Sequence, residues 1–308
     1  MNINLSRRRF GAVIAATAAV AAAPKRAIAE TSSGLSPAPT GPAPTGLGDD
    51  VKTFRKAVKW GMIDIDGPPL DKFQLCQELG YDGMELISPG QPPIDELRAA
   101  VAQTGMPIHG LVNERHWQVR LSAPDQATRD AARAILEQAI RDAHAMGGFT
   151  VLLVPGVVNE EANHDQVWKR SVAEIKKVLP LASLLGVRVL IENVWNGFCE
   201  TPEQLRDYLD EIDSPWVGSY YDIGNSQKFS ASENWIRVLG SRIVKLDVKD
   251  WGVTAGFCKI GDGDVNWAAV REALAEINFS GWCTAEVTGG GRDELADISR
   301  RMDQVLLG

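Results

Sequence analysis

Cysteine and histidine are scarce in this chain, which has only four of each among its 308 residues. The cysteines form no Cys-x-x-Cys pair, so their spacing indicates neither a zinc site nor a disulfide framework. They are Cys76, Cys199, Cys258 and Cys283. Cys76 and Cys283 lie in apolar stretches, which predicts small buried side chains.

Basic residues are also fewer than acidic ones, since the chain has 32 basic and 40 acidic residues and a formal net charge of -8. Residues 1–29 contain five basic residues and no acidic one, so their removal would take the balance to -13. Such a surface repels phosphate backbones and anionic lipid, which argues against nucleic acid and membrane partners. The chain is 44% hydrophobic and 23% charged, which is typical of a globular protein with a large single core. A small neutral substrate fits the acidic composition better than a nucleic acid or a membrane does.

The first 29 residues have the pattern of a cleaved export signal. Arg7-Arg8-Arg9-Phe10 precedes a short apolar run, and Ala27-Ile28-Ala29 follows as a small-residue cleavage pattern. The paired arginines resemble a twin-arginine signal, which implies the twin-arginine export machinery as a partner and a periplasmic or secreted protein. An uncleaved N-terminal anchor is the alternative, but the apolar run is too short for a membrane span, and we expect no stable membrane association.

Residues 30–50 repeat a Pro-Ala-Pro-Thr-Gly segment and predict an extended linker, so that the folded catalytic domain comprises residues 51–308. From there the sequence alternates short β-rich runs with longer amphipathic stretches. The expected strands are residues 57–62, 83–86, 108–111, 150–154, 188–192, 218–222, 243–248 and 283–287. Helical patterns cover residues 70–79, 94–103, 125–146, 164–185, 202–211, 267–277 and 292–306.

Eight such alternations over about 250 residues predict a single-domain α/β protein, a (β/α)8 TIM barrel. A doubly wound open sheet is the structural rival. It normally carries a glycine-rich phosphate-binding turn after its first strand, and this chain has none. The barrel is therefore favoured, and its active site is expected at the C-terminal ends of the strands.

Each of the last four predicted strands brings a carboxylate to that end of the barrel. These residues are Glu192, Asp222, Asp247 and Glu286. Acids that end apolar strands are costly to desolvate and would repel one another, and a divalent cation between them resolves both problems. An all-oxygen shell suits a hard ion such as Mn2+ or Mg2+. The alternative is that each acid caps a helix or pairs with Lys249, Lys245 or Arg242.

The motifs around these acids resemble the xylose isomerase-like TIM barrel superfamily, and within it the sugar phosphate isomerase/epimerase family of ketose 3-epimerases and hydroxypyruvate isomerase. They are Ile191-Glu192-Asn193, Tyr221-Asp222-Ile223-Gly224-Asn225, Asp247-Val248-Lys249-Asp250, Gly261-Asp262-Gly263-Asp264-Val265-Asn266-Trp267 and Ala285-Glu286. The resemblance implies metal ligands Glu192, Asp222 and Glu286. Asp247 stands where the family has histidine, which makes the ligand shell more anionic. A more anionic shell favours Mn2+ over Zn2+, with Mg2+ or Co2+ as alternatives.

The resemblance also implies an enzyme of carbohydrate metabolism, an isomerase or epimerase that transfers a proton of a keto- or hydroxy-sugar through a metal-stabilised enediolate. Glu192 and Glu286 would be the catalytic acid and base. The sugar could carry a phosphate, and a homo-oligomer is possible. Candidate substrate-binding residues at the strand ends are Glu85, His109, His116, Trp117, Asn193, Trp195, Asn225 and Lys249.

Three other classes of function compete with this interpretation. Endonuclease relatives of the same barrel use a histidine-rich metal cluster and a basic groove, which the four histidines and the acidic balance disfavour. A lyase or hydrolase of 3-keto-glycosides would use the same metal-enediolate chemistry with elimination of the aglycone. A non-catalytic sugar-binding barrel is the third alternative, supported only by the altered histidine position.

Overall fold

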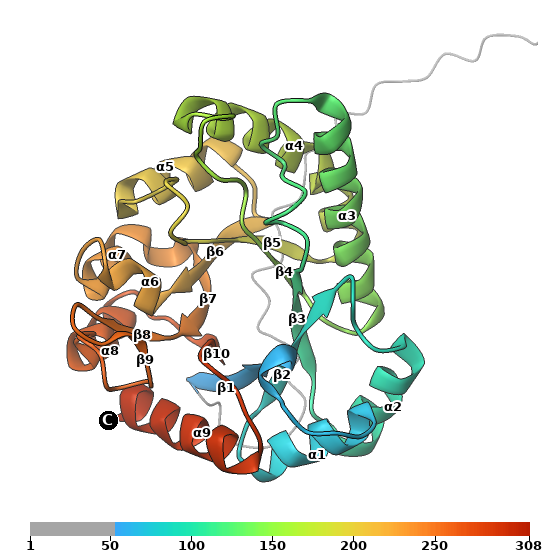
Figure 1. Ribbon diagram of the computed structural model, residues 1–308, viewed down its shortest axis with the longest axis vertical. Coiled ribbons are helices and arrows are strands. Elements are labelled where there is room, and N and C mark those ends of the chain that lie inside the picture. The colour runs from blue at the N-terminus through green and yellow to red at the C-terminus, as the bar shows by residue number, and fades with distance from the viewer. Residues whose placement is uncertain (1–52) are drawn as a thin grey trace, which may run out of the picture. The chain divides into compact units, whose positions relative to one another are not determined.

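The computed structural model describes residues 53–308, which form a closed barrel of eight parallel strands surrounded by helices (Figure 1). Around the barrel the strands follow the order β1, β10, β7, β6, β5, β4, β3 and β2. Their bounds are Phe54–Lys59 (β1), Gly83–Ser88 (β2), Ile108–Asn113 (β3), Thr150–Leu153 (β4), Arg188–Glu192 (β5), Val217–Asp222 (β6), Ile243–Val248 (β7) and Gly281–Ala285 (β10). The predicted barrel is confirmed. The predicted export signal and linker lie outside the described residues.

Two short α-helices between β6 and β7 were not predicted, whereas all the other α-helices of the described residues agree with the predicted ranges to within one residue at each end. The helices are Pro69–Glu78 (α1), Ile94–Thr104 (α2), Gln126–Ala145 (α3), His164–Leu185 (α4), Pro202–Ile212 (α5), Ile223–Gln227 (α6), Ser232–Leu239 (α7), Trp267–Glu276 (α8) and Arg292–Leu307 (α9), with 3-10 turns at Trp60–Met62 (η1) and Gly240–Arg242 (η2). Among the described residues, none of these helices combines the length and the apolar character that a membrane crossing would need.

Local sequence signals fix the ends of several helices. Asp125 accepts a hydrogen bond from the Thr128 backbone N–H at the start of α3. Asn163 and Thr201 each form a capping box with the glutamine three residues later, before α4 and α5. Gly105 and Gly186 end α2 and α4 in the left-handed conformation, which a residue without a Cβ adopts most easily.

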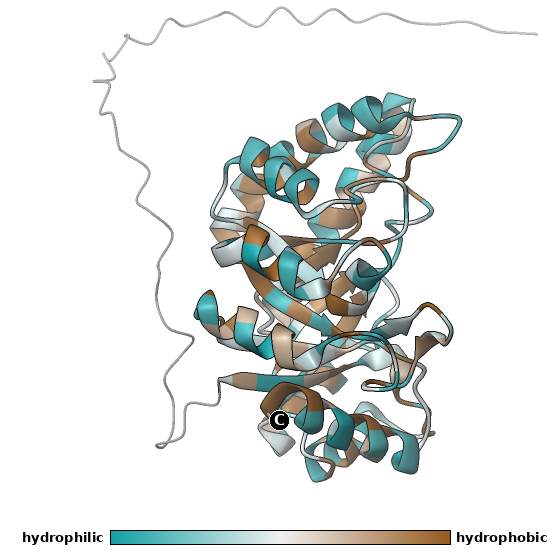
Figure 2. Ribbon diagram, turned by 90° about the vertical axis from the view of Figure 1, so that its left-hand side faces the viewer, coloured by the Kyte–Doolittle hydropathy of each residue, from teal (hydrophilic) through white to brown (hydrophobic). Residues whose placement is uncertain are grey.

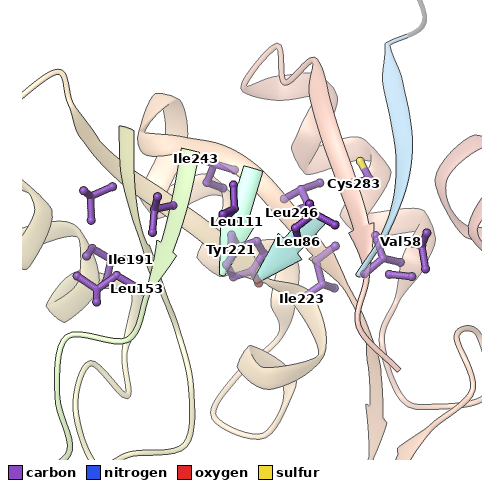
Figure 3. Packing of buried hydrophobic residues seen from close by; sticks show 14 of the residues in the cluster. Val58, Leu86, Leu111, Leu153, Ile191, Tyr221, Ile223, Ile243, Leu246 and Cys283 are labelled. Atoms are coloured by element: carbon purple, nitrogen blue, oxygen red, sulfur yellow. The ribbon is translucent and has the colours of Figure 1, made fainter. Parts of the chain in front are cut away.

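The hydrophobic core lies between the barrel and the helices, whose exposed faces are mainly hydrophilic (Figure 2). Leu111, Ile191 and Leu246 contribute to it from three different strands (Figure 3). Side chains alternate between the two faces of each strand, so Tyr221 packs against this core while Tyr220 belongs to a separate small cluster with Leu152 and Leu190. The interior of the barrel therefore holds this small cluster, together with buried polar residues such as Glu85, His109 and Lys245.

Several strand ends differ from the prediction by one to three residues, and two of these differences concern charged residues at the rim. The first strand ends at Lys59, because residues 60–62 form the turn η1, so Lys59 lies at the C-terminal end of its strand. The last strand ends at Ala285, which makes Glu286 the first residue of the following loop. An antiparallel hairpin, Asp250–Gly252 (β8) and Gly256–Cys258 (β9), follows β7 and was not anticipated.

Candidate metal centre and active site

The four carboxylates predicted from the strand ends come together in the structure. Each of Glu192, Asp222, Asp247 and Glu286 offers an oxygen atom, and these atoms all lie within 4.8 Å of one another. They come from β5, β6, β7 and the residue after β10, which are consecutive neighbours in the barrel. Asp222 pairs directly with Asp247 across β6 and β7, which explains how adjacent parallel strands align their terminal acids.

Two lysines neutralise part of this negative charge. Lys59 Nζ lies 2.9 Å from Asp247 Oδ2 and 2.8 Å from Glu286 Oε1. Lys249 Nζ lies 3.0 Å from Asp222 Oδ2 and 2.7 Å from Glu286 Oε2. With all six groups ionised, the four carboxylates exceed the two ammonium groups by two negative charges. Lys249 was a predicted site residue, whereas Lys59 was missed because its strand was placed too far along the chain.

The charge balance and the donor atoms both fit one divalent cation. Asp247 Oδ1 is buried and has no hydrogen-bond partner among the described residues, and an unsatisfied buried carboxylate oxygen is costly. Carboxylate oxygens are the ligands that Mn2+ and Mg2+ prefer. The alternative of helix capping and ion pairing applies in part, since Asp222 accepts from the Asn225 backbone N–H and pairs with Lys249, but it leaves the Asp247 oxygen unexplained.

The Asp222–Asn225 segment is held in place by a compact hydrogen-bond network. The Asn193 side chain donates to the Asp222 carbonyl and accepts from the Asp222 N–H, both at 2.8 Å. Asn225 Nδ2 donates to the Asn193 carbonyl at 3.0 Å and approaches Glu192 Oε1 at 3.4 Å. A Cβ on Gly224 would lie 2.8 Å from the Lys249 carbonyl carbon, so only glycine permits this approach of α6. Asn193 thus positions a residue of the carboxylate cluster and does not line the cavity.

The second aspartate of the Asp247-Val248-Lys249-Asp250 motif orders the following loop. Asp250 is fully buried and accepts hydrogen bonds from the Gly261 N–H and the Trp267 indole N–H. A Cβ on Gly263 would lie 2.2 Å from Asp250 Oδ1. The Gly261-Asp262-Gly263-Asp264 motif is therefore explained by a loop that closes around Asp250, and this acid lies outside the carboxylate cluster.

Burial and the two lysines push the pKa values of the clustered acids in opposite directions. Burial raises the pKa of Glu192 and of Asp247 well above the usual values, and it raises the pKa of Asp222 to about 7 despite the opposing effect of Lys249. Burial acts in the same sense on Glu286, but Lys59 and Lys249 outweigh it and hold the pKa of Glu286 well below its usual range. The site therefore separates the proton affinities of two neighbouring glutamates.

A cavity of about 610 Å³ opens above the cluster, and Glu192 and Glu286 both line it. Among the predicted substrate-binding residues, His116, Trp117, Trp195, Asn225 and Lys249 line the same cavity. His116 Nδ1 accepts from the Val154 N–H at 3.1 Å, and burial lowers the pKa of His116 to about 3. The ring is therefore neutral, with its proton on Nε2.

The structure places Glu85 and His109 deeper, inside the barrel and outside the cavity lining. The Tyr220 hydroxyl donates to both carboxylate oxygens of Glu85, each at 3.0 Å. The His109 ring stacks on Trp282, and the two ring centroids are 4.4 Å apart. Both are buried, and the buried Lys245 lies against His109. These residues form a polar layer beneath the site, and substrate contact by them remains a prediction.

An eight-stranded parallel barrel with a carboxylate centre at its C-terminal rim defines this chain as a TIM-barrel protein of the type that builds active sites there. The chain belongs to the xylose isomerase-like TIM barrel family, whose model matches residues 73–304. This confirms the family resemblance seen in the sequence motifs.

Sugar epimerases are found among the relatives of this chain. A putative L-ribulose-5-phosphate 3-epimerase, SgbU of Escherichia coli K12, is 26% identical over 194 residues, which cover 60% of this chain and 68% of the relative. The L-ribulose-5-phosphate 3-epimerase UlaE of Escherichia coli ATCC 8739 is 25% identical over 264 residues, covering 77% of this chain and 88% of the relative.

Solved structures agree with the fold. A structure of L-ribulose 3-epimerase superposes with a TM-score of 0.70 at 18% identity, covering 82% of this chain and 94% of that one. The IolI protein, solved with a bound zinc atom, superposes with a TM-score of 0.69 at 16% identity, covering 82% of this chain and 98% of that one. At these identities the likeness concerns the fold, and the IolI structure shows that this fold can hold a divalent metal.

Proposed function

We propose that this chain is a divalent-metal-dependent epimerase or isomerase that acts on a keto- or hydroxy-sugar. The observation that carries the proposal is the convergence of Glu192, Asp222, Asp247 and Glu286 beneath a cavity that Glu192 and Glu286 line. With all six groups ionised, the cluster has two negative charges beyond those that Lys59 and Lys249 balance. The sugar epimerases among its relatives support the reaction class.

The four clustered carboxylates would hold the ion, and their oxygen donors favour Mn2+, with Mg2+ or Co2+ as alternatives. Such an ion, when bound, acts as a Lewis acid on the carbonyl or hydroxyl oxygen of the sugar. The Asn193 and Asn225 side chains keep the Asp222 segment in place, so the ligand geometry is organised before binding.

Glu192 and Glu286 are the proposed proton-transfer residues. Both line the cavity, and they come from β5 and the end of β10, which are separated by β6 and β7 in the barrel. They can therefore approach a substrate carbon from different sides. In the metal-free cluster the lysines favour the ionised form of Glu286 and burial favours the protonated form of Glu192, so the two glutamates differ in proton affinity, as an acid and base pair requires. A bound cation would favour the ionised form of Glu192 as well. Neutral His116 can donate its Nε2 proton to a sugar hydroxyl group.

Proton exchange with solvent provides the decisive test. Protein lacking residues 1–29 is loaded with Mn2+ and incubated in D2O with free ketoses and with 3-keto-glycosides, and deuterium incorporation is followed by NMR. We expect deuterium at the carbon next to the carbonyl, and we expect Glu192→Gln to lower the rate by about 10²- to 10⁴-fold. Glu203→Gln, which alters an exposed acid on α5, serves as the control.

The same experiment separates the alternatives. Release of an aglycone would identify eliminating chemistry, and metal binding without any exchange would identify a sugar-binding protein. Full activity of Glu192→Gln would refute the role of that residue. Metal content, measured by mass spectrometry on protein purified without chelator, checks the ion independently of turnover.

We also propose that residues 1–29 direct twin-arginine export and that residues 30–50 form the linker to the catalytic domain. The support is the sequence pattern alone. Intact-mass measurement of exported protein is expected to give a chain that begins at Glu30, and a chain that begins at Met1 would refute cleavage.

A further inference from the structure

The wall of the cavity differs in character from its floor. The floor carries the charged residues, whereas the wall includes Trp117, Trp195 and Phe257. These aromatic side chains keep 39%, 36% and 51% of their surface exposed, and all of them line this one cavity. Leaving large apolar rings in water forgoes favourable burial, and exposed apolar groups gathered at one place are typical of a ligand-binding surface.

Two members of the aromatic wall, Trp195 and Phe257, are held by contacts within the protein. The Trp195 indole N–H donates to the Asn225 carbonyl at 2.8 Å, which ties the ring to the metal-site segment. Phe257, on strand β9 of the hairpin, stacks on Trp195 with ring centroids 4.6 Å apart and planes 22° apart. Trp251 packs edge-on against Trp195. The loop after β5 and the β8–β9 hairpin therefore meet through an aromatic contact, and an aromatic surface arranged before binding would lower the entropic cost of binding.

Lys228, beside the aromatic wall, has its Nζ over the Trp195 ring, 4.2 Å from the centroid, and is not part of the cavity lining. The lining of the cavity offers no uncommitted cation to a phosphate group. Among the described residues that line it, Lys59 and Lys249 are the basic ones, and both are bound to carboxylates of the cluster. Glu114 adds a further acid to the lining. Arg and Lys are the usual side-chain partners of a phosphate group, so this lining favours an unphosphorylated sugar. Its volume of about 610 Å³ lies in the range of sites for drug-sized ligands, larger than one sugar ring requires.

From these observations we infer that the substrate is an unphosphorylated sugar that carries an apolar, preferably aromatic, substituent, with the sugar over the carboxylate cluster and the substituent against Trp117, Trp195 and Phe257. This inference rests on the proposed function for the position of the sugar. It assigns to Phe257 and the β8–β9 hairpin a role in substrate specificity, and it separates this chain from enzymes that select a sugar phosphate.

Matched glycosides test the inference by binding alone. Calorimetric titrations with Mn2+ present compare the phenyl and methyl β-glycosides of glucose, galactose and xylose, together with glucose 6-phosphate. We expect the phenyl glycoside of at least one sugar to bind on the order of tenfold more tightly than its methyl counterpart. Phe257→Ala and Trp117→Ala should each reduce this ratio, whereas Phe257→Tyr should keep it. Val253→Ala is the control, because Val253 is 81% exposed in the same hairpin and does not line the cavity.

An absence of phenyl preference in every series, including an absence of all binding, would overturn the inference. So would tightest binding of glucose 6-phosphate, or a phenyl preference that Phe257→Ala and Trp117→Ala leave intact. Deuterium exchange distinguishes this failure from failure of the proposed function. Exchange without phenyl preference would refute only the aromatic subsite, and phenyl preference without exchange on any keto-sugar would refute only the catalytic proposal.

Discussion

Lys59 Nζ on β1 lies 2.9 Å from Asp247 Oδ2 on β7, although β10 separates these two strands in the barrel. The acid stands where the family resemblance places a neutral histidine, and it therefore adds one negative charge to the cluster. The ammonium group of Lys59 supplies one positive charge next to it. When both groups are ionised, Lys59 offsets the charge that Asp247 adds, which helps to explain how a fourth carboxylate is accommodated in a buried site.

Removal of Lys59 is expected to destabilise the metal-free protein and to increase its response to metal. Lys59→Met leaves Asp247 and Glu286 without their shared cation, which should cost on the order of 3 kcal/mol of unfolding free energy in the presence of EDTA. Without Lys59, its ammonium group no longer competes with an added ion for the same carboxylate oxygens. Mn2+ should therefore raise the Tm of Lys59→Met by more than it raises the Tm of the unmodified protein. Thermal denaturation with EDTA and with Mn2+ measures both effects.

Lys56→Met is the matched control for this prediction. Lys56 lies on the same strand, is buried, and pairs with Asp303 at 2.7 Å, away from the carboxylate cluster. Its removal should lower Tm without changing the increment caused by Mn2+. Equal Mn2+ increments in the two variants would show that Lys59 does not interact with the ion site.

The sequence predicted the barrel and the four clustered acids because both depend on local, periodic signals. Parallel strands bring their C-terminal ends to one rim, so an acid at the end of each of the last four strands could be placed in the same site without knowledge of the tertiary contacts. Asn225, Lys249 and Trp195 were found for the same reason, since each follows a strand end within a few residues.

What the sequence could not supply was the identity of contacts between distant elements. Lys59 was missed because a one-turn helix, η1, continues an apolar run that resembled the end of the strand. Phe257 was missed because the short β8–β9 hairpin has no periodic pattern, and its contact with Trp195 spans separate loops. Glu85 could be placed at the end of its strand, but its burial beneath the site depends on Tyr220 from across the barrel.

Restoration of histidine at position 247 is expected to change the metal preference. Asp247→His replaces a hard oxygen donor by a nitrogen donor, which should raise the affinity for Zn2+ relative to Mn2+ by at least about tenfold. Competition titrations of the two ions against a fluorescent chelator give the ratio of Zn2+ affinity to Mn2+ affinity for each protein. The control is Asp262→His, which alters an exposed acid outside the cluster. Asp250→His is unsuitable as a control, because Asp250 orders a buried loop. An unchanged ratio in Asp247→His would place residue 247 outside the metal shell.

The stability of the metal-free protein is expected to fall as pH rises from about 5 to 7.5. The pKa of Asp222 is raised from 3.8 to about 7 by burial, so folding favours its protonated form, and the stabilisation present below pH 3.8 is lost as pH rises towards 7. Glu192 and Asp247 have raised pKa values and act in the same direction, whereas the depressed pKa of Glu286 keeps that group ionised throughout this range. One proton gives a slope of up to about 1.4 kcal/mol per pH unit.

Bound metal replaces these protons, so the rise in Tm caused by Mn2+ should grow over the same pH range. Thermal denaturation at pH 5, 6, 7 and 8, with EDTA and with Mn2+, measures both slopes. Asp222→Asn should make the slope in EDTA less steep, because one of the groups that titrate is gone. Asp210→Asn should leave it unchanged, because Arg242 lowers the pKa of that exposed acid and keeps it ionised across the range. If the stability of the metal-free protein rose between pH 5 and 7.5, this result would contradict the raised pKa values. It would also contradict the crowding of unbalanced acids that makes this site suited to a cation.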